Sequence, residues 1–115
     1  MLPKTHRIHT DQDIKELVQT GKTFFLPQLT IKYAPNNDGV TKVGFIVSSK
    51  VDKKAVVRHR LTRRMREASR RLLDDIRPGY SLLIIAKKAA IELSFEDLSK
   101  QLIFAFSQMK IYNKK

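Results

Sequence analysis

The chain has 115 residues, of which 42% are hydrophobic, so it can bury one core and is too short to make a second domain the expectation. Lysine and arginine outnumber aspartate and glutamate by 23 to 11, for a formal charge of +12. A small domain with this much self-repulsion usually binds a polyanion, which favours nucleic acid over a basic protein that is merely soluble. The absence of cysteine excludes disulfides and thiolate metal sites.

The sequence gives no indication of a membrane segment. No apolar run approaches the roughly 20 residues of a spanning helix, and the longest, LLIIA, has the length of a strand. The first residues, MLPKTHRIHTDQD, contain no apolar signal core. We therefore expect a cytoplasmic protein without a membrane partner, and a monomer in its free form.

The first predicted elements are an extended basic arm over residues 1–9 and a short helix. Thr10 can cap this helix, Asp13 follows the cap by three residues, and Gly21 ends the helix. Its apolar positions are Ile14, Leu17 and Val18. This spacing predicts a helix with one face toward a core.

Two segments after this helix alternate as half-buried strands do. The first lies between residues 24 and 33, and the second is KVGFIVSS. The inward faces are Leu29, Ile31 and Tyr33 in the first segment, opposite Thr30 and Lys32, and Val43, Phe45 and Val47 in the second. Pro35 and the turn sequence NNDG separate the two segments, so we expect an antiparallel hairpin with a long loop.

A basic amphipathic helix is predicted within VVRHRLTRRMREASRR, residues 56–71. Leu61, Met65, Ala68 and Leu72 recur on one narrow arc and should pack inward. The opposite side carries His59, Arg60, Arg63, Arg64, Arg66, Arg70 and Arg71. Arg58 falls beside Met65 on an ideal helix, so we expect it to precede the helix and to spread outward with its two neighbours.

Arginine is the residue type to explain in this helix. Glu67 lies four residues from both Arg63 and Arg71, and one acid cannot neutralise so many guanidiniums. A solvated charged face usually interleaves Glu with Lys, whereas guanidiniums match phosphate oxygens and stack on bases. The pattern favours phosphate recognition over a merely solvated face.

The last elements are a strand and a helix. RPGY supplies a turn, and YSLLIIA is apolar enough to be buried on both faces, as in a parallel pair joined by a crossover helix. Ser94 can cap a final helix with the stripe Leu98, Leu102, Phe106 and Met109, before a basic tail over residues 110–115. We predict a single-domain α+β two-layer sandwich, in the order α-β-β-β-α-β-α, with a mainly antiparallel sheet and one parallel pair.

The segment KVGFIVSSKVDKKAVVRHRLTRRMREA resembles the core of the bacterial ribonuclease P protein component, whose hallmark is Arg-Asn-Arg after a VGxxVSKK strand. The segments MLPKTHRI, VQTGKT, RPGYSLLIIAKKAA and LSFEDLSKQL follow in the family's order and spacing. The resemblance implies a left-handed crossover and a subunit that binds the catalytic ribonuclease P RNA and the 5′ leader of precursor tRNA. It also implies that the RNA performs the cleavage and holds most of the Mg²⁺. The protein would then perform no bond chemistry, and none of its residues is singled out as a metal ligand.

The resemblance also implies which residues bind. The residues expected to contact RNA are Lys50, Lys53, Lys54, Arg58, His59, Arg60, Thr62, Arg63, Arg64, Arg66 and Arg70. Those expected to line the leader cleft are Ile14, Val18, Phe25 and Lys32. His59 stands where the family usually has Asn, and Thr62 where it has Lys. Ile14 and Val18 replace two aromatics, and Lys32 replaces a frequent Tyr.

Three other functions compete with this hypothesis. A ribosomal-type structural RNA-binding protein would have similar charge and fold class. An independent enzyme could use His6, His9, Asp11 and Asp13 as a metal or acid–base cluster, although capping of a helix start explains the acids better. A helix-turn-helix DNA binder is disfavoured, because strands flank the basic helix.

Overall fold

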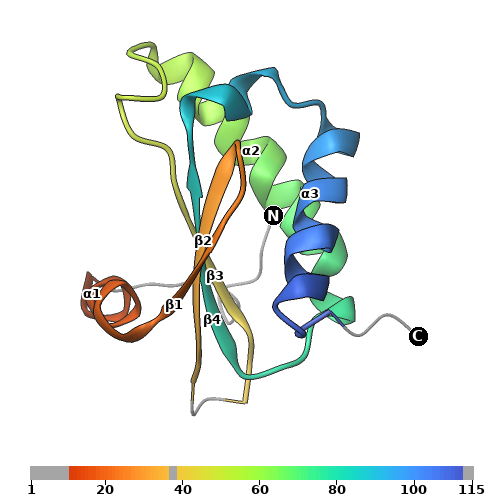
Figure 1. The fold of residues 1–115 in the computed structure, drawn as a ribbon. Helices are drawn as coiled ribbons and strands as arrows, with labels where there is room; N and C mark the ends of the chain where they lie inside the picture. The colour runs from red at the N-terminus through yellow and green to blue at the C-terminus, as the bar shows by residue number, and fades with distance from the viewer. Residues whose placement is uncertain (1–10, 37–38, 113–115) are drawn as a thin grey trace.

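The computed structural model describes residues 11–36 and 39–112 (Figure 1). The helices are α1 (Asp11–Thr20), α2 (Ala55–Leu72) and α3 (Phe95–Gln108), and the strands are β1 (Lys22–Phe25), β2 (Leu29–Pro35), β3 (Lys42–Ile46) and β4 (Tyr80–Ala86). Two short 3-10 helices are η2 (Leu73–Asp75) and η3 (Lys88–Glu92). This order confirms the predicted α-β-β-β-α-β-α arrangement. Within the described ranges, no helix is both long and apolar enough to cross a membrane.

The sheet has the strand order β1-β2-β4-β3. β4 pairs antiparallel with β2, with Ile31 opposite Ile84, and parallel with β3, with Val43 opposite Leu82. The predicted parallel pair joined by α2 is therefore confirmed. The predicted hairpin between residues 24–33 and KVGFIVSS is wrong, because β4 lies between them. Leu82, Leu83 and Ile84 are fully buried in β4, and a strand that is apolar on both faces is stable at the centre of a sheet.

The hairpin that does form joins β1 and β2. Lys22 lies opposite Tyr33, and Phe25 lies opposite Thr30. A tight turn at residues 26–28 closes the hairpin, with the Leu26 amide donating to the Leu29 carbonyl oxygen at 2.8 Å. The alternation predicted for β2 is confirmed, since Leu29 and Ile31 are buried and Thr30 and Lys32 are half-buried.

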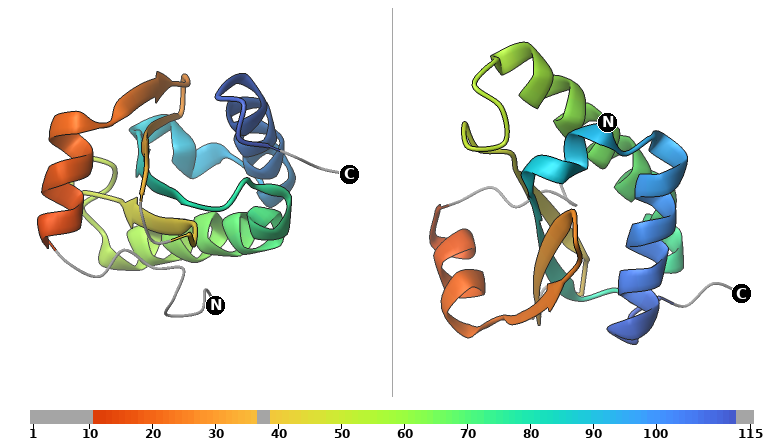
Figure 2. Two further views of the ribbon diagram at one scale, coloured as in Figure 1. Left: turned by 90° about the horizontal axis from the view of Figure 1, so that it is seen from below. Right: turned by 45° about the horizontal axis from the view of Figure 1, so that its top comes forward.

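Helices cover both faces of this sheet. Figures 1 and 2 show α1 on one face and α2 with α3 on the other. The main core lies on the α2–α3 side and includes the predicted inward arc Leu61, Met65, Ala68 and Leu72. α1 partly covers the opposite face, where Leu17 and Leu83 are buried outside that main cluster. The two predicted layers are thus the sheet and the α2–α3 pair, with α1 as a partial third layer.

The ends of the helices follow the predicted chemistry. The Gly21 amide donates to the Leu17 carbonyl oxygen at 2.9 Å where α1 stops, while the expected cap Thr10 lies outside the described residues. The Ser94 hydroxyl accepts from the Asp97 amide at 3.1 Å, which confirms the cap of α3. The stripe Leu98, Leu102, Phe106 and Met109 is buried as expected. Within the segment expected as a basic tail, Ile111 is buried and accepts a hydrogen bond from the Arg77 amide at 2.7 Å.

Candidate functional site

The N-terminal part of α2 differs from the expectation for Arg58. The helix begins at Ala55, so Arg58 is its fourth residue, and the prediction that it precedes the helix is wrong. Its side chain runs back toward the helix start, as helical side chains do, and Nη1 donates to the carbonyl oxygens of Asp52 at 2.8 Å and Lys53 at 2.9 Å. His59 and Arg60 are exposed, whereas Arg58 is half-buried. The three side chains therefore do not spread outward together.

Four predicted RNA-contacting residues meet in a shallow depression on α2. His59, Thr62, Arg63 and Arg66 line it, and its volume is about 220 Å³. The Thr62 hydroxyl donates to the Arg58 carbonyl oxygen at 2.9 Å, one turn back in the helix. His59 and Arg63 are exposed. The depression therefore presents guanidinium and imidazole groups suited to phosphate oxygens and to base edges.

The remaining arginines of α2 do not all face the same way. Arg64 Nη1 donates to the Leu93 carbonyl oxygen at 2.6 Å, which ties α2 to the segment between η3 and α3. The Arg71 guanidinium lies 4.9 Å from the centre of the Phe95 ring, a cation–π contact with α3. The structure therefore brings Arg63 and Arg66 together with His59, and directs Arg64 toward another part of the fold.

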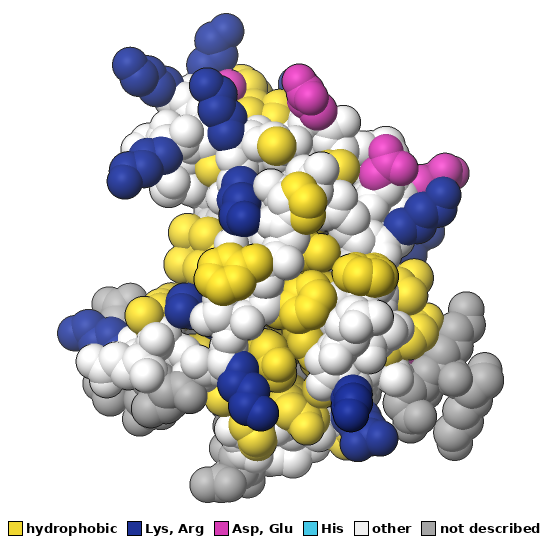
Figure 3. All heavy atoms as spheres, in the orientation of Figure 1, with side chains coloured by type: hydrophobic (Ala, Val, Ile, Leu, Met, Phe, Trp, Pro, Cys, Tyr) yellow, Lys and Arg dark blue, Asp and Glu magenta, His cyan; other side chains and the backbone are white. Residues whose placement is uncertain are grey.

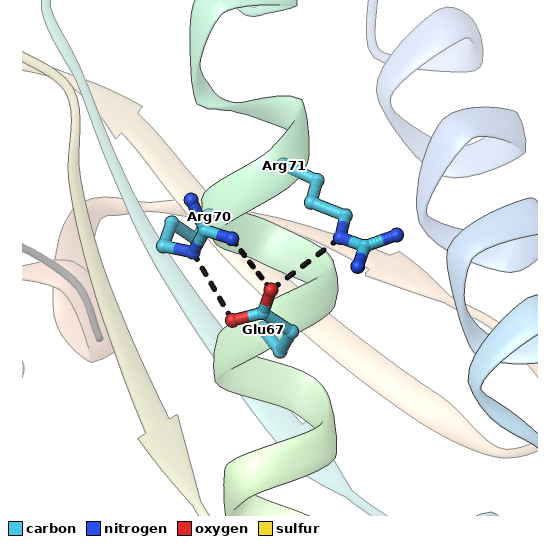
Figure 4. A network of polar contacts seen from close by, with 3 residues as sticks. All are labelled: Glu67, Arg70 and Arg71. Carbon is cyan, nitrogen blue, oxygen red and sulfur yellow. Dashed lines mark hydrogen bonds and ion pairs between the residues drawn. The ribbon is translucent and has the colours of Figure 1, made fainter.

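Glu67 is the acidic centre of the network in Figure 4. Its carboxylate accepts from Arg70 at 2.6 Å and from Arg71 at 3.4 Å. Of the two arginines four residues away, Glu67 pairs with Arg71 and, among the described residues, has no ion pair with Arg63; its other partner is Arg70, three residues away. The hydrogen bond from Arg70 lowers the pKa of Glu67 from 4.5 to about 2, and Glu67 in turn raises the pKa of Arg70.

A lysine-rich loop precedes α2. Figure 3 shows dark blue side chains gathered at the upper left, over this loop and the first turns of α2, with magenta side chains at the upper right over the start of α3. We call residues 48–54 the lysine loop. Its predicted RNA-contacting residues Lys50, Lys53 and Lys54 are all exposed. The loop ends where α2 begins, and both segments carry basic side chains that are expected to contact RNA.

The residues expected in the leader cleft belong to the face of the sheet that α1 covers. Lys32 lies opposite Leu83 in the sheet register, and its Nζ donates to the Thr23 hydroxyl at 3.1 Å. Val18 of α1 is 47% exposed and Phe25 of β1 is 73% exposed, whereas Ile14 is half-buried. Phe25 is therefore the exposed aromatic side chain of this set, and an exposed ring is a group on which a base can stack.

Two contributors to these surfaces were missing from the sequence prediction. Lys87 Nζ donates to the Leu26 carbonyl oxygen at 2.7 Å and lies 5.8 Å from the centre of the Phe25 ring. Lys87 reaches Leu26 and Phe25 because β4 pairs with β2. No local sequence pattern around Lys87 predicts these contacts. Asp52 accepts from the Lys54 amide through Oδ1 at 2.8 Å. Aspartate side chains often accept from the backbone amide two residues later and so form a turn. This known preference could have identified the contact of Asp52 from the sequence.

The side chains that can donate hydrogen bonds on the lysine loop and in the depression on α2 are mostly those of Lys and Arg. In residues 11–36 and 39–112 no group of three or more His, Cys, Asp or Glu side chains could hold a metal ion. Of the imagined metal or acid–base cluster, His6 and His9 lie outside the described residues. The described arrangement is suited to binding an extended anion by charge and hydrogen bonds.

Comparison with known proteins agrees with this chemistry. The family model for ribonuclease P matches residues 2–110. The chain is 37% identical over 112 residues to the ribonuclease P protein component of Picosynechococcus sp., covering 97% of each chain. It also resembles two solved structures in fold, one a Staphylococcus aureus RNase P protein mutant with defective mRNA degradation activity (TM-score 0.86, 22% identity, 95% of this chain and 92% of that one). The other is the RNase P protein of Thermotoga maritima (TM-score 0.80, 22% identity, 89% and 96%).

Proposed function

Because this chain belongs to the ribonuclease P protein family and is thus a subunit in the 5′ maturation of tRNA, we propose how its two surfaces divide that work. The partner that family membership implies is ribonuclease P RNA. The lysine loop and the depression on α2 bind this RNA. The face beside α1 binds the single-stranded 5′ leader of precursor tRNA.

The observation that carries the first assignment is the depression lined by His59, Thr62, Arg63 and Arg66. Arg64 donates to the Leu93 carbonyl oxygen and Arg71 lies over the Phe95 ring. By contrast, Arg63 and Arg66 line this depression. Phosphate contacts made by such cations release counterions from RNA, which provides most of the affinity. His59 adds a group that can donate to or accept from a base.

The leader assignment rests on exposed apolar groups next to a cation. Phe25 offers a ring on which a base can stack, a contact worth about 1 to 3 kcal/mol per base in single-stranded complexes. Val18 adds exposed apolar surface, and Lys32 adds a charge that attracts the backbone. Lys32 cannot stack as an aromatic does, so we expect a leader contact with little base preference at that position.

We further propose that the protein performs no bond chemistry and that Mg²⁺ is held mainly by the RNA. The donor set supports this division, because the side chains proposed to contact the RNA are Lys, Arg, His and Thr, whereas Mg²⁺ prefers carboxylate and phosphate oxygens. The Mg²⁺ ion would supply charge stabilisation at the reacting phosphate, and the protein's cations would offset repulsion between the two RNAs. The net charge of +12 also supports a monomer, because copies of the chain repel one another. The lack of cysteine is compatible with a reducing compartment such as the cytoplasm.

The test is cleavage of precursor tRNA by the cognate ribonuclease P RNA at limiting Mg²⁺, with and without the protein. We expect the protein to increase cleavage at the mature 5′ end, and Arg63→Glu to remove most of this gain. Lys100→Glu, with the same change in charge on the exposed side of α3, is the matched control and should retain it. No gain with the unmodified protein would contradict the proposal and favour a structural RNA-binding role.

A further arm tests whether the protein acts alone. Protein without the RNA subunit is incubated with precursor tRNA and with an mRNA fragment, since an activity on mRNA is named for the Staphylococcus aureus relative. We expect both substrates to remain intact. Cleavage that follows the protein through purification and disappears with Arg63→Glu would overturn the proposal that the protein lacks bond chemistry.

A further inference from the structure

The lysine loop is held in place at three points although it has no regular secondary structure. Val51 is only 4% exposed and joins the main core, and its amide donates to the Ser48 carbonyl oxygen at 3.0 Å. The Asp52 carboxylate accepts from the Lys54 amide at 2.8 Å. Arg58 Nη1 then bonds the carbonyl oxygens of both Asp52 and Lys53. These contacts fix the backbone on either side of the exposed lysines.

Asp52 is the unexpected member of this arrangement. A carboxylate beside Lys50, Lys53 and Lys54 weakens the attraction of the loop for a polyanion, so its charge does not help RNA binding. Its position is explained by the hydrogen bond to the Lys54 amide, since that bond shapes the turn into α2.

Arg58 has a similar geometric role. Arg58 differs from Arg60 and Arg63 because its Nη1 already donates to two backbone carbonyl oxygens, those of Asp52 and Lys53. Ordering a mobile loop and its long side chains upon binding costs free energy, which a loop already held in place avoids. Arg58 therefore contributes most through the residues that it holds.

We propose that Arg58 and Asp52 are positioning residues that hold the lysine loop so that Lys53 and Lys54 engage ribonuclease P RNA. This inference rests on the proposed RNA-binding function of the same surface. It replaces the direct phosphate contact expected for Arg58 by an indirect contribution to binding.

The first test compares Asp52→Asn with Asp52→Ala in the full chain by equilibrium binding to the cognate RNA. Both changes remove one negative charge, so electrostatics alone predicts the same tightening for both. Asn retains the side-chain oxygen that accepts from the Lys54 amide, whereas Ala does not. We expect Asp52→Ala to bind about three- to tenfold more weakly than Asp52→Asn. Equal affinities would overturn the role of Asp52.

The second test is a double-mutant cycle for Arg58. Arg58→Met is measured in the unmodified chain and in a Lys53→Ala, Lys54→Ala background. If Arg58 acts through these lysines, its replacement should cost about tenfold in affinity in the first chain and little in the second. Arg60→Met, at an exposed position of the same helix, is the control and should cost the same in both backgrounds. Equal costs for Arg58→Met in both backgrounds would show a direct contact and overturn the inference.

These outcomes can be separated from failure of the proposed function. If the unmodified chain does not bind ribonuclease P RNA, the proposed function itself is wrong, and so is the inference built on it. If it binds and both comparisons give equal values, only the positioning role is wrong. Thermal unfolding of each variant establishes that the compared proteins are folded, and amide exchange over residues 53–57 should be faster in Arg58→Met and Asp52→Ala than in the unmodified chain.

Discussion

Glu67 is the acidic residue of α2, and its carboxylate is shared by Arg70 and Arg71. It limits how much of the helix's positive charge is available to an RNA. An exposed ion pair of this kind adds little to folding stability, because solvent screens it and both side chains lose freedom. At the scale of the residue, the effect of Glu67 on RNA binding should therefore exceed its effect on folding.

Replacing Glu67 by Gln tests this. The change releases Arg70 and Arg71 from the carboxylate and removes one negative charge, so we expect RNA affinity to rise by about threefold at moderate salt, with only a small decrease in melting temperature. Filter binding and thermal unfolding provide the two measurements. Glu92→Gln, an equal charge change at an exposed position of η3, is the control. An equal gain for both variants would mean that only net charge matters.

The lowered pKa of Glu67 also predicts how its contribution depends on pH. The folded pKa of about 2 lies below the ordinary value of 4.5, so the stabilisation is fully present above about pH 4.5 and is lost as pH falls through about 2. Denaturant unfolding of the unmodified chain and Glu67→Gln between pH 7 and pH 2 measures the difference. The difference should be constant down to about pH 4.5 and should shrink below it. A constant difference down to pH 2 would contradict the lowered pKa.

At the scale of the element, the approach of α1 to the sheet depends on Gly21. A Cβ at this position would meet the Leu17 carbonyl oxygen well inside van der Waals distance and the Tyr33 carbonyl oxygen at 3.2 Å. Both obstacles are backbone atoms, which cannot rotate away. Gly21 thus allows the chain to leave α1 and start β1 directly beside β2.

Gly21→Ala should therefore displace α1 from the sheet. We expect a loss of about 1 to 3 kcal/mol in the free energy of unfolding, as for overpacking elsewhere. We also expect weaker binding of a leader oligonucleotide, because Val18 and Phe25 would no longer keep their arrangement. Gln19→Ala, on the exposed side of α1, is the control and should change neither quantity. Unchanged stability in Gly21→Ala would show that α1 adjusts without cost.

At the scale of the whole molecule, the basic side chains of α2 divide into those of the proposed RNA-binding surface and those that contact other parts of the fold. Arg63 and Arg66 line the depression, whereas Arg64 donates to the Leu93 carbonyl oxygen. The total charge of +12 does not reveal this division. Salt dependence does, because it counts the phosphates that are neutralised in the complex.

We expect Arg63→Ala and Arg66→Ala each to reduce the slope of log affinity against log salt by about one phosphate contact. Arg64→Ala should change the slope less and lower the melting temperature more, since it loses a hydrogen bond between α2 and the segment before α3. Titrations at several salt concentrations and thermal unfolding measure both properties. Equal slopes for the three variants would contradict the division.

The order of elements could be predicted from sequence because each element has a strong local signal. The apolar arc of α2, the Ser94 cap and the apolar run of β4 all depend on residues close in sequence. Strand pairing does not, since β4 reaches the centre of the sheet only after α2 has returned the chain. The turn inside residues 24–33 was missed although Pro27 marks it, because the alternation in β2 dominated the pattern.

The basic surface was predictable in composition and less so in geometry. Residue types and spacing identified His59, Arg63 and Arg66, which an ideal helix places on one side. The same geometry could not give the contacts of Arg64 and Lys87, because each depends on where a long side chain meets the backbone of a distant segment. Such contacts follow from tertiary structure, which local periodicity does not contain.

The basic helix α2 is also the connection between the two parallel strands β3 and β4. An isolated 18-residue segment with this many like charges would form little helix in water, so the surface exists only after distant parts of the chain have paired. Immature chains carry the same charge without the arrangement and should associate with RNA only loosely. Because a ligand that binds only the folded state stabilises that state by mass action, RNA bound at this surface should raise the free energy of unfolding of the whole chain.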